Sequence, residues 1–188
     1  EPNHKEALYG IGNCLTKVGK FDDAIKAYNR CLYGKNYSSD YELFKPKAEI
    51  GPDYDPDSRQ KEIYSLDYKD FHAEMGRMGR ISQVEVSNIG YLAAYNLGAL
   101  LESFGDESGA ISNYYTAAEL APFNTKPLIS LGNILLANGA YDAAVHVFMD
   151  AVALDDRSTY HKVYYGLSLA LDARGSNGDS EAARDALE

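Results

Sequence analysis

Three aspartates at alternate positions are the first residues in this chain whose types and spacing could do chemistry. Asp53, Asp55 and Asp57 resemble the opening of a calcium-binding loop, in which alternate carboxylates coordinate the ion. Such a loop also needs a glycine at its sixth position and a bidentate glutamate at its twelfth. Ser58 and Tyr64 occupy those positions here, so the sequence predicts no calcium site.

The other residues that could hold a metal ion or attack a substrate are scattered. The four histidines lie far apart, with no cysteine or carboxylate at ligand spacing. Cys14 and Cys31 fall where helix packing calls for a small side chain, so we expect buried, reduced thiols and a reducing compartment such as the cytoplasm. We predict no catalytic residue, no metal and no cofactor, and do not expect an enzyme.

Composition limits the kinds of partner. The protein has 188 residues and a net charge of −10, with an isoelectric point near 4.8. A strongly acidic surface repels phosphate groups, which argues against nucleic acid and anionic membranes as main partners. The sequence contains no run of apolar residues long enough to span a bilayer, so we predict no membrane insertion.

The elements that must position any site come from a recurring helix pair. Gly12 is followed by Ala24 and then by the aromatic Tyr28, and the same spacing recurs from Gly98 and again from Gly132. Gly98 and Gly132 lie 34 residues apart. A fixed period of about 20–50 residues is typical of stacked units, none of which can bury its apolar face alone. The matching positions are Ala110 and Tyr114 after Gly98, and Ala144 and Phe148 after Gly132.

This pattern resembles the tetratricopeptide repeat (TPR). The resemblance implies an all-α fold, a right-handed α-solenoid of helix-turn-helix repeats. We expect these residues to be a segment of a longer array. We predict one such solenoid over residues 1–188, and its repeats cover residues 5–38, 91–124 and 125–158, with a partial repeat over 159–188.

An insertion separates the first repeat from the second. Residues 39–86 do not fit the repeat, and their prolines and charges indicate an irregular loop followed by a helix over about 58–79. That amphipathic helix either packs on the solenoid or forms a second contact surface for a partner. Its apolar stripe consists of Tyr64, Tyr68, Phe71, Met75 and Met78.

The resemblance also implies where a partner binds. In this family the first helix of each pair lines a concave groove that holds an extended peptide or a partner helix. Asparagine can hold a backbone amide with both a donor and an acceptor, and tyrosine offers a large rigid surface. The partner-binding residues expected here are Tyr9, Asn13, Lys17, Tyr95, Asn96, Lys126, Asn133, Tyr160 and Tyr164, with Glu102 on the same side.

Two functions follow from this interpretation. We expect a scaffold or adaptor that binds another protein, as a subunit of a larger assembly. The alternative is the substrate-selecting arm of an enzyme, such as a glycosyltransferase, whose catalytic domain lies outside these residues. A co-chaperone role is disfavoured, because only Lys126 matches the basic and amide residues with which related proteins grip a chaperone tail.

Overall fold

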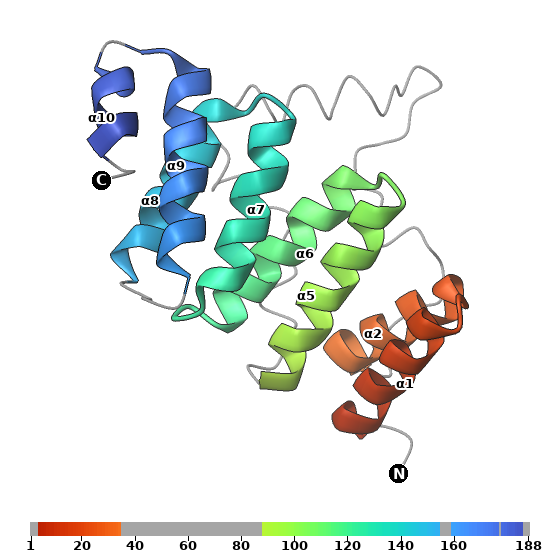
Figure 1. Cartoon of the computed structure of the whole chain (residues 1–188). Coiled ribbons are helices and arrows are strands. Elements are labelled where there is room, and N and C mark those ends of the chain that lie inside the picture. The colour runs from red at the N-terminus through yellow and green to blue at the C-terminus, as the bar shows by residue number, and fades with distance from the viewer. Residues whose placement is uncertain (1–3, 35–87, 155–158, 177, 186–188) are drawn as a thin grey trace, which may run out of the picture. The chain divides into compact units, whose positions relative to one another are not determined.

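The computed structural model describes residues 4–34, 88–154, 159–176 and 178–185, and these residues form eight α-helices (Figure 1). Two compact units hold four helices each. The predicted all-α class is confirmed. Unit 1 contains α1 (Lys5–Lys17), α2 (Phe21–Tyr33), α5 (Asn88–Ser103) and α6 (Glu107–Leu120); unit 2 contains α7 (Thr125–Ala137), α8 (Tyr141–Ala153), α9 (Tyr160–Arg174) and α10 (Asp179–Asp185).

Tight turns join the two helices of a pair. Gly19, Gly105 and Gly139 adopt φ angles of 76°, 75° and 78°, the left-handed conformation that glycine reaches without strain. Each of these glycines follows the first helix of its pair and stops it. The predicted insertion, with its stripe of Tyr64, Tyr68, Phe71, Met75 and Met78, lies outside the described residues.

An aromatic ring packed on a glycine holds each helix pair of unit 1 together. A Cβ atom added to Gly12 would lie 2.5 Å from Cε1 of Tyr28, and one added to Gly98 would lie 2.9 Å from Cδ1 of Tyr114. Both tyrosines are buried. The ring is therefore the nearest obstacle to a side chain at either glycine, and at Gly98 the backbone oxygen of Ala110 follows at 3.3 Å. We call Gly12, Gly98 and Gly132 the repeat glycines and Tyr28, Tyr114 and Phe148 the repeat aromatics.

The two pairs of unit 1 are neighbours in space although residues 35–87 separate them in sequence. Helix α5 packs against both α1 and α2 (Figure 1). The rings of Phe21 and Phe104, at the turns of the two pairs, lie edge to face with centroids 5.0 Å apart. The first and second repeats therefore stack directly on each other.

In unit 2 one aromatic ring serves two glycines. Cβ atoms added to Gly132 on α7 and Gly166 on α9 would lie 2.7 Å and 2.4 Å from ring atoms of Phe148. Phe148 comes from α8, which packs against both neighbouring helices, and its side chain is fully buried. The tight spacing of α7, α8 and α9 therefore depends on a single phenylalanine.

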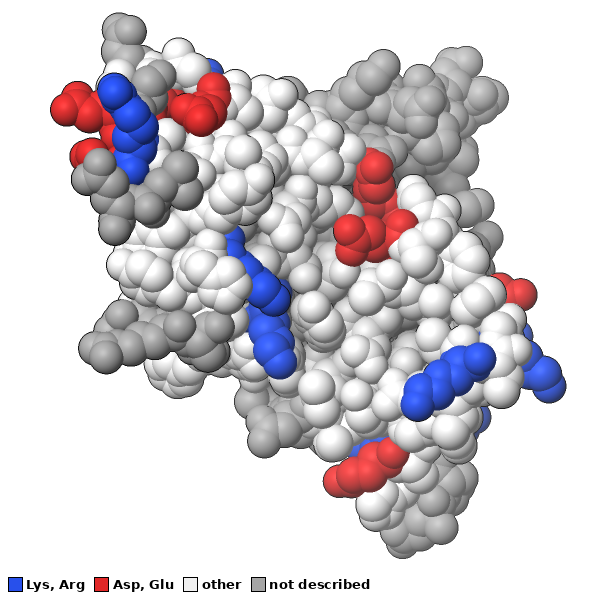
Figure 2. All heavy atoms as spheres, in the orientation of Figure 1, with Lys and Arg blue, Asp and Glu red and all other residues white. Residues whose placement is uncertain are grey.

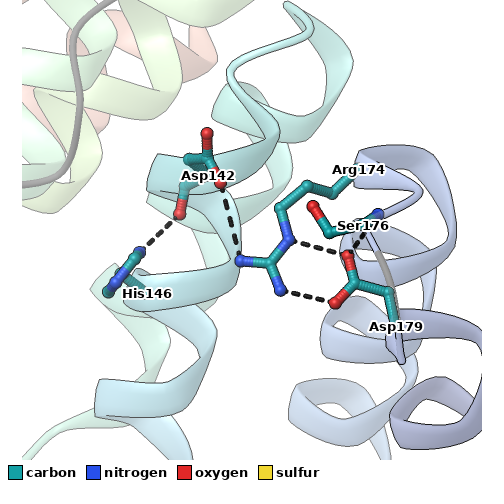
Figure 3. Close-up of polar contacts among 5 residues, drawn as sticks. All are labelled: Asp142, His146, Arg174, Ser176 and Asp179. Carbon is teal, nitrogen blue, oxygen red and sulfur yellow. Dashed lines mark hydrogen bonds and ion pairs between the residues drawn. The ribbon is translucent and has the colours of Figure 1, made fainter.

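The last pair departs from the others. Its second helix, α10, begins late: Ala183 is buried seventeen residues after Gly166, whereas Ala24 follows Gly12 after twelve. Arg174 donates from Nε and Nη2 to the two carboxylate oxygens of Asp179, at 2.8 Å and 2.6 Å (Figure 3). The Asp179 carboxylate also accepts the Ser176 backbone N–H at 2.9 Å. These bonds close the longer turn.

A weaker ion pair extends this cluster to α8. Nη1 of Arg174 lies 3.5 Å from a carboxylate oxygen of Asp142, whose side chain is mostly exposed (Figure 3). The backbone oxygen of Asp142 lies 2.7 Å from Nδ1 of His146. The hydrogen bonds from Arg174 hold the pKa of Asp179 below its ordinary value. The carboxylate is therefore charged at neutral pH.

The two cysteines differ, which corrects the expectation that both are buried. Cys31 is fully buried, and burial raises the pKa of its thiol to about 11. Cys14 is exposed. The residues at the same repeat position in later pairs, Leu100 and Ile134, are buried. In the described part of the chain no helix precedes α1, so that face of α1 is uncovered.

Candidate functional site

Four of the predicted residues and their neighbours meet on one surface of unit 1. Nδ2 of Asn96, on α5, donates to Oδ1 of Asn13 at 2.9 Å and to the Tyr9 hydroxyl at 3.2 Å, both on α1. The Tyr28 hydroxyl donates to the same Oδ1 of Asn13 at 2.7 Å. We call this surface of α1 and α5, which includes Tyr9, Asn13, Tyr95 and Asn96, the α1–α5 face.

The cluster leaves one amide group of each asparagine unused. Nδ2 of Asn13 and Oδ1 of Asn96 have no hydrogen-bond partner among the described residues. Both side chains are only half-buried. The α1–α5 face therefore presents one unused donor and one unused acceptor, each held in place by the bonds at the other end of its own amide.

Tyr28, a buried residue of α2, holds this cluster of Asn13, Asn96 and Tyr9 in place. Its ring packs on Gly12, and its hydroxyl reaches Asn13, with the Thr16 hydroxyl 3.4 Å away. Burial raises the pKa of Tyr28 above its ordinary value, so the hydroxyl keeps its proton and remains a donor. The polar cluster thus rests on a residue of the core.

Aromatic rings continue the face along α5. The ring of Tyr95 lies 6.4 Å from that of Tyr91 and 5.5 Å from that of the buried Tyr114. The Tyr114 hydroxyl donates to Oε2 of Glu102 at 2.5 Å. Glu102 itself is exposed, near the end of α5. Each repeat aromatic of unit 1 therefore orients a polar side chain at the surface.

The predicted residues of unit 2 form no comparable cluster. Asn133 lies on α7 at the repeat position of Asn13, but it is exposed and has no hydrogen bond among the described residues. Lys126 and, in unit 1, Lys17 are exposed and form no ion pair within the described ranges. Tyr160 and Tyr164 stack on each other with ring centroids 4.1 Å apart.

Two features of the face were not anticipated from the sequence. The repeat pattern predicted no hydrogen-bond partner for Tyr28, and it did not predict the hydrogen bond between Tyr114 and Glu102. An available signal was the residue type at the aromatic position. It is tyrosine in both pairs of unit 1 and phenylalanine at the same position in α8, and a buried hydroxyl needs a partner.

Within the described ranges, no group of three or more His, Cys, Asp or Glu side chains could hold a metal ion. The described helices are also each too short or too polar to cross a membrane.

Comparisons with known proteins identify two of the helix pairs. Residues 6–33 in unit 1 and residues 126–157 in unit 2 match models of the tetratricopeptide repeat. A solved structure described as the crystal structure of MamA protein is similar at 18% sequence identity, over 100% of this chain and 91% of that chain, with a TM-score of 0.48. No curated protein matches the chain.

Proposed function

Because this chain carries tetratricopeptide repeats, we propose that it is a protein-interaction scaffold whose α1–α5 face holds an extended segment of a partner protein. The repeats support a scaffold in general. The finer proposal rests on the donor and acceptor that Asn13 and Asn96 leave unused.

The two unused amide groups complement a peptide bond. A partner carbonyl accepts from Nδ2 of Asn13, and a partner N–H donates to Oδ1 of Asn96. Both groups belong to main chain, so this contact recognises an extended segment without demanding a particular side chain. Helical partners satisfy their own backbone groups, so they gain little here. The proposal therefore favours an extended peptide over a helix.

Binding benefits because the site is already ordered. The bonds that Asn13 and Asn96 share with Tyr9 and Tyr28 fix both amides before a partner arrives. Ordering a flexible polar side chain costs about 0.5–1.5 kcal/mol on binding, and this cost is reduced here. The Tyr9 and Tyr95 rings, both half-buried, add rigid contact area beside the amides.

The test begins with a ligand obtained without assumptions about the partner. Random twelve-residue peptides are displayed and selected on the full chain, and the best binders are measured by fluorescence anisotropy. We expect Asn13→Ala and Asn96→Ala each to weaken binding about tenfold, because each leaves one group of the bound peptide bond unpaired. Met149→Ala, on an exposed position of α8, is the control and is expected to bind normally.

The proposal is wrong if the selected peptides bind the two asparagine variants as tightly as the wild-type chain. Far-ultraviolet circular dichroism must first show that both variants are folded, because Asn13 also accepts the Tyr28 hydroxyl. The second predicted contact surface, the stripe from Tyr64 to Met78, stays a prediction, since it lies outside the described residues.

A further inference from the structure

We infer that the α1–α5 face selects a segment carrying an arginine or lysine, whose cationic group binds Glu102 while its aliphatic stem lies against Tyr95. This inference rests on the proposed function, because it specifies the segment that the same face holds. It is carried by the geometry of Glu102, by a comparison with the other repeats and by the small residue beside it.

Glu102 presents an oriented carboxylate. Its Oε2 atom accepts the hydroxyl of Tyr114, which is only 2% exposed and therefore cannot follow a moving side chain. The Oε1 atom has no partner among the described residues, and Glu102 is exposed. A carboxylate with one oxygen fixed and the other open is suited to accept a charged N–H donor.

Packing alone does not call for a charge at this position. Glu102 follows the repeat glycine Gly98 by four residues, and Thr16 follows Gly12 by four. The hydroxyl of Tyr28 is satisfied there by neutral groups, Asn13 and Thr16. A neutral acceptor would therefore serve Tyr114 equally well. In α7 the corresponding residue is Leu136, and Phe148 has no hydroxyl to satisfy.

The surface beside Glu102 leaves room for a long side chain. Tyr95, Ala99 and Glu102 lie at helical spacings of four and three, so they share one face of α5. Ala99 is exposed and stands at the position that Asn13 holds on α1. A basic side chain crossing Ala99 would meet the Tyr95 ring at one end and the carboxylate at the other.

The charges of unit 1 favour a positively charged group on the partner. Neither Glu102 nor Lys17 on α1 forms an ion pair among the described residues. In the space-filling view, acidic side chains lie over the upper end of α5 and α6, and both basic and acidic side chains lie over α1 (Figure 2). The net charge of −10 adds a long-range attraction for basic segments.

The spacing along α5 also predicts the register. Asn96 and Glu102 are six residues apart on α5, which is about 9 Å along the helix axis, and an extended chain advances about 3.3 Å per residue. A segment whose peptide bond is held at Asn13 and Asn96 therefore reaches the neighbourhood of Glu102 about three residues away. Selected peptides should carry their basic residue at that distance from a position with no side-chain preference.

The decisive experiment compares arginine with citrulline, its neutral isostere, in one selected peptide. On the wild-type chain we expect the citrulline peptide to bind about tenfold more weakly, since a hydrogen-bonded ion pair is lost. On Glu102→Gln, which keeps an acceptor for Tyr114 but has no charge, the two peptides should bind within a factor of two. Asp22→Asn, an exposed acid of α2 without an ion pair among the described residues, controls for net charge.

The outcomes separate the two proposals. If peptides bind through Asn13 and Asn96 but show no basic residue, or if arginine keeps its advantage on Glu102→Gln, the selectivity inference is overturned and the proposed function stands. If no selected peptide depends on Asn13 or Asn96, the proposed function fails and the inference with it. A tenfold arginine advantage that Glu102→Gln removes and Asp22→Asn preserves supports both.

Discussion

Both units pack an aromatic ring against a glycine where two helices cross, but the type of ring differs. Tyr28 and Tyr114 pack on the repeat glycines of unit 1, and Phe148 packs on Gly132 and Gly166 in unit 2. All three rings are buried, so the helix crossing requires an aromatic ring but no hydroxyl. In unit 1 the hydroxyls of Tyr28 and Tyr114 donate to Asn13 and Glu102, two side chains at the surface, and orient them. The comparison separates what the fold needs from what the α1–α5 face adds.

The largest effect should come from filling the space that unit 2 reserves for Phe148. We expect Gly132→Leu to destabilise the chain by about 3 kcal/mol, because its first added atom would lie 2.7 Å from the ring. Urea unfolding followed by circular dichroism measures the change. Gly10→Ala is the matched control on α1, where nothing lies within 4 Å, and it should be neutral or slightly stabilising. A loss below about 1 kcal/mol for Gly132→Leu would contradict the role given to Phe148.

Exchanging the rings between the units should give the next largest effect. Phe148→Tyr adds a hydroxyl at the Cζ atom of a fully buried ring that already packs closely on Gly132 and Gly166, and should cost about 2 kcal/mol. Tyr28→Phe removes one hydrogen bond to Asn13, which keeps its bond to Asn96, and should cost about 1 kcal/mol. Both are measured by urea unfolding. Equal costs would mean that the surroundings of the two rings do not differ in the way described.

The repeat spacing made the all-α class predictable from the sequence. A glycine, an alanine and an aromatic at fixed distances have a direct physical meaning, because they mark where two helices pack closely. The contact of Asn96 with Asn13 could not be predicted in the same way. It depends on α5 stacking directly on α1 and α2, and residues 35–87 separate those helices in sequence.

The last pair shows a second limit of sequence reasoning. Gly166 lies 34 residues after Gly132, so the repeat period predicts an aromatic from its own second helix, yet the ring packed on it is Phe148 of the preceding pair. Exposure also differs at the position before the glycine of a pair: Tyr165 is 58% exposed and Ile11 is 49% exposed, whereas Leu131 is 1% exposed. A longer turn changes which side chains meet, and a period of residue types does not record that.

The α10 helix adds a further difference between the two units. Its turn is closed by the ion pair of Arg174 and Asp179, and no ion pair is recorded at a turn of unit 1 among the described residues. With seven residues, α10 is too short to be stable alone. The pKa of Asp179 is lower in the folded state than in the unfolded chain. The carboxylate therefore contributes its full stabilisation above the unfolded pKa near 3.9, and this stabilisation is lost as the pH falls through the folded pKa.

We therefore expect the protection of the α10 amides, corrected for the intrinsic exchange rate at each pH, to fall below about pH 4, with little change in α7 and α8. Arg174→Gln should cause the same local loss of protection at neutral pH. Asp142→Asn should have the smaller effect, because its carboxylate is 3.5 Å from Arg174 and mostly exposed. Protection of α10 that is the same in Arg174→Gln and the wild-type chain would exclude this role for the ion pair.

The smallest expected effect is the most direct comparison of the two units as binding surfaces. Asn133 and Asn13 occupy the same repeat position, but only Asn13 is held by hydrogen bonds. If order before binding is what makes the α1–α5 face effective, Asn133→Ala should weaken peptide binding less than threefold, against about tenfold for Asn13→Ala. Fluorescence anisotropy with one selected peptide measures both. A larger loss for Asn133→Ala would mean that a free asparagine of unit 2 contributes as much as the ordered pair, and the contrast between the units would then lie in packing alone.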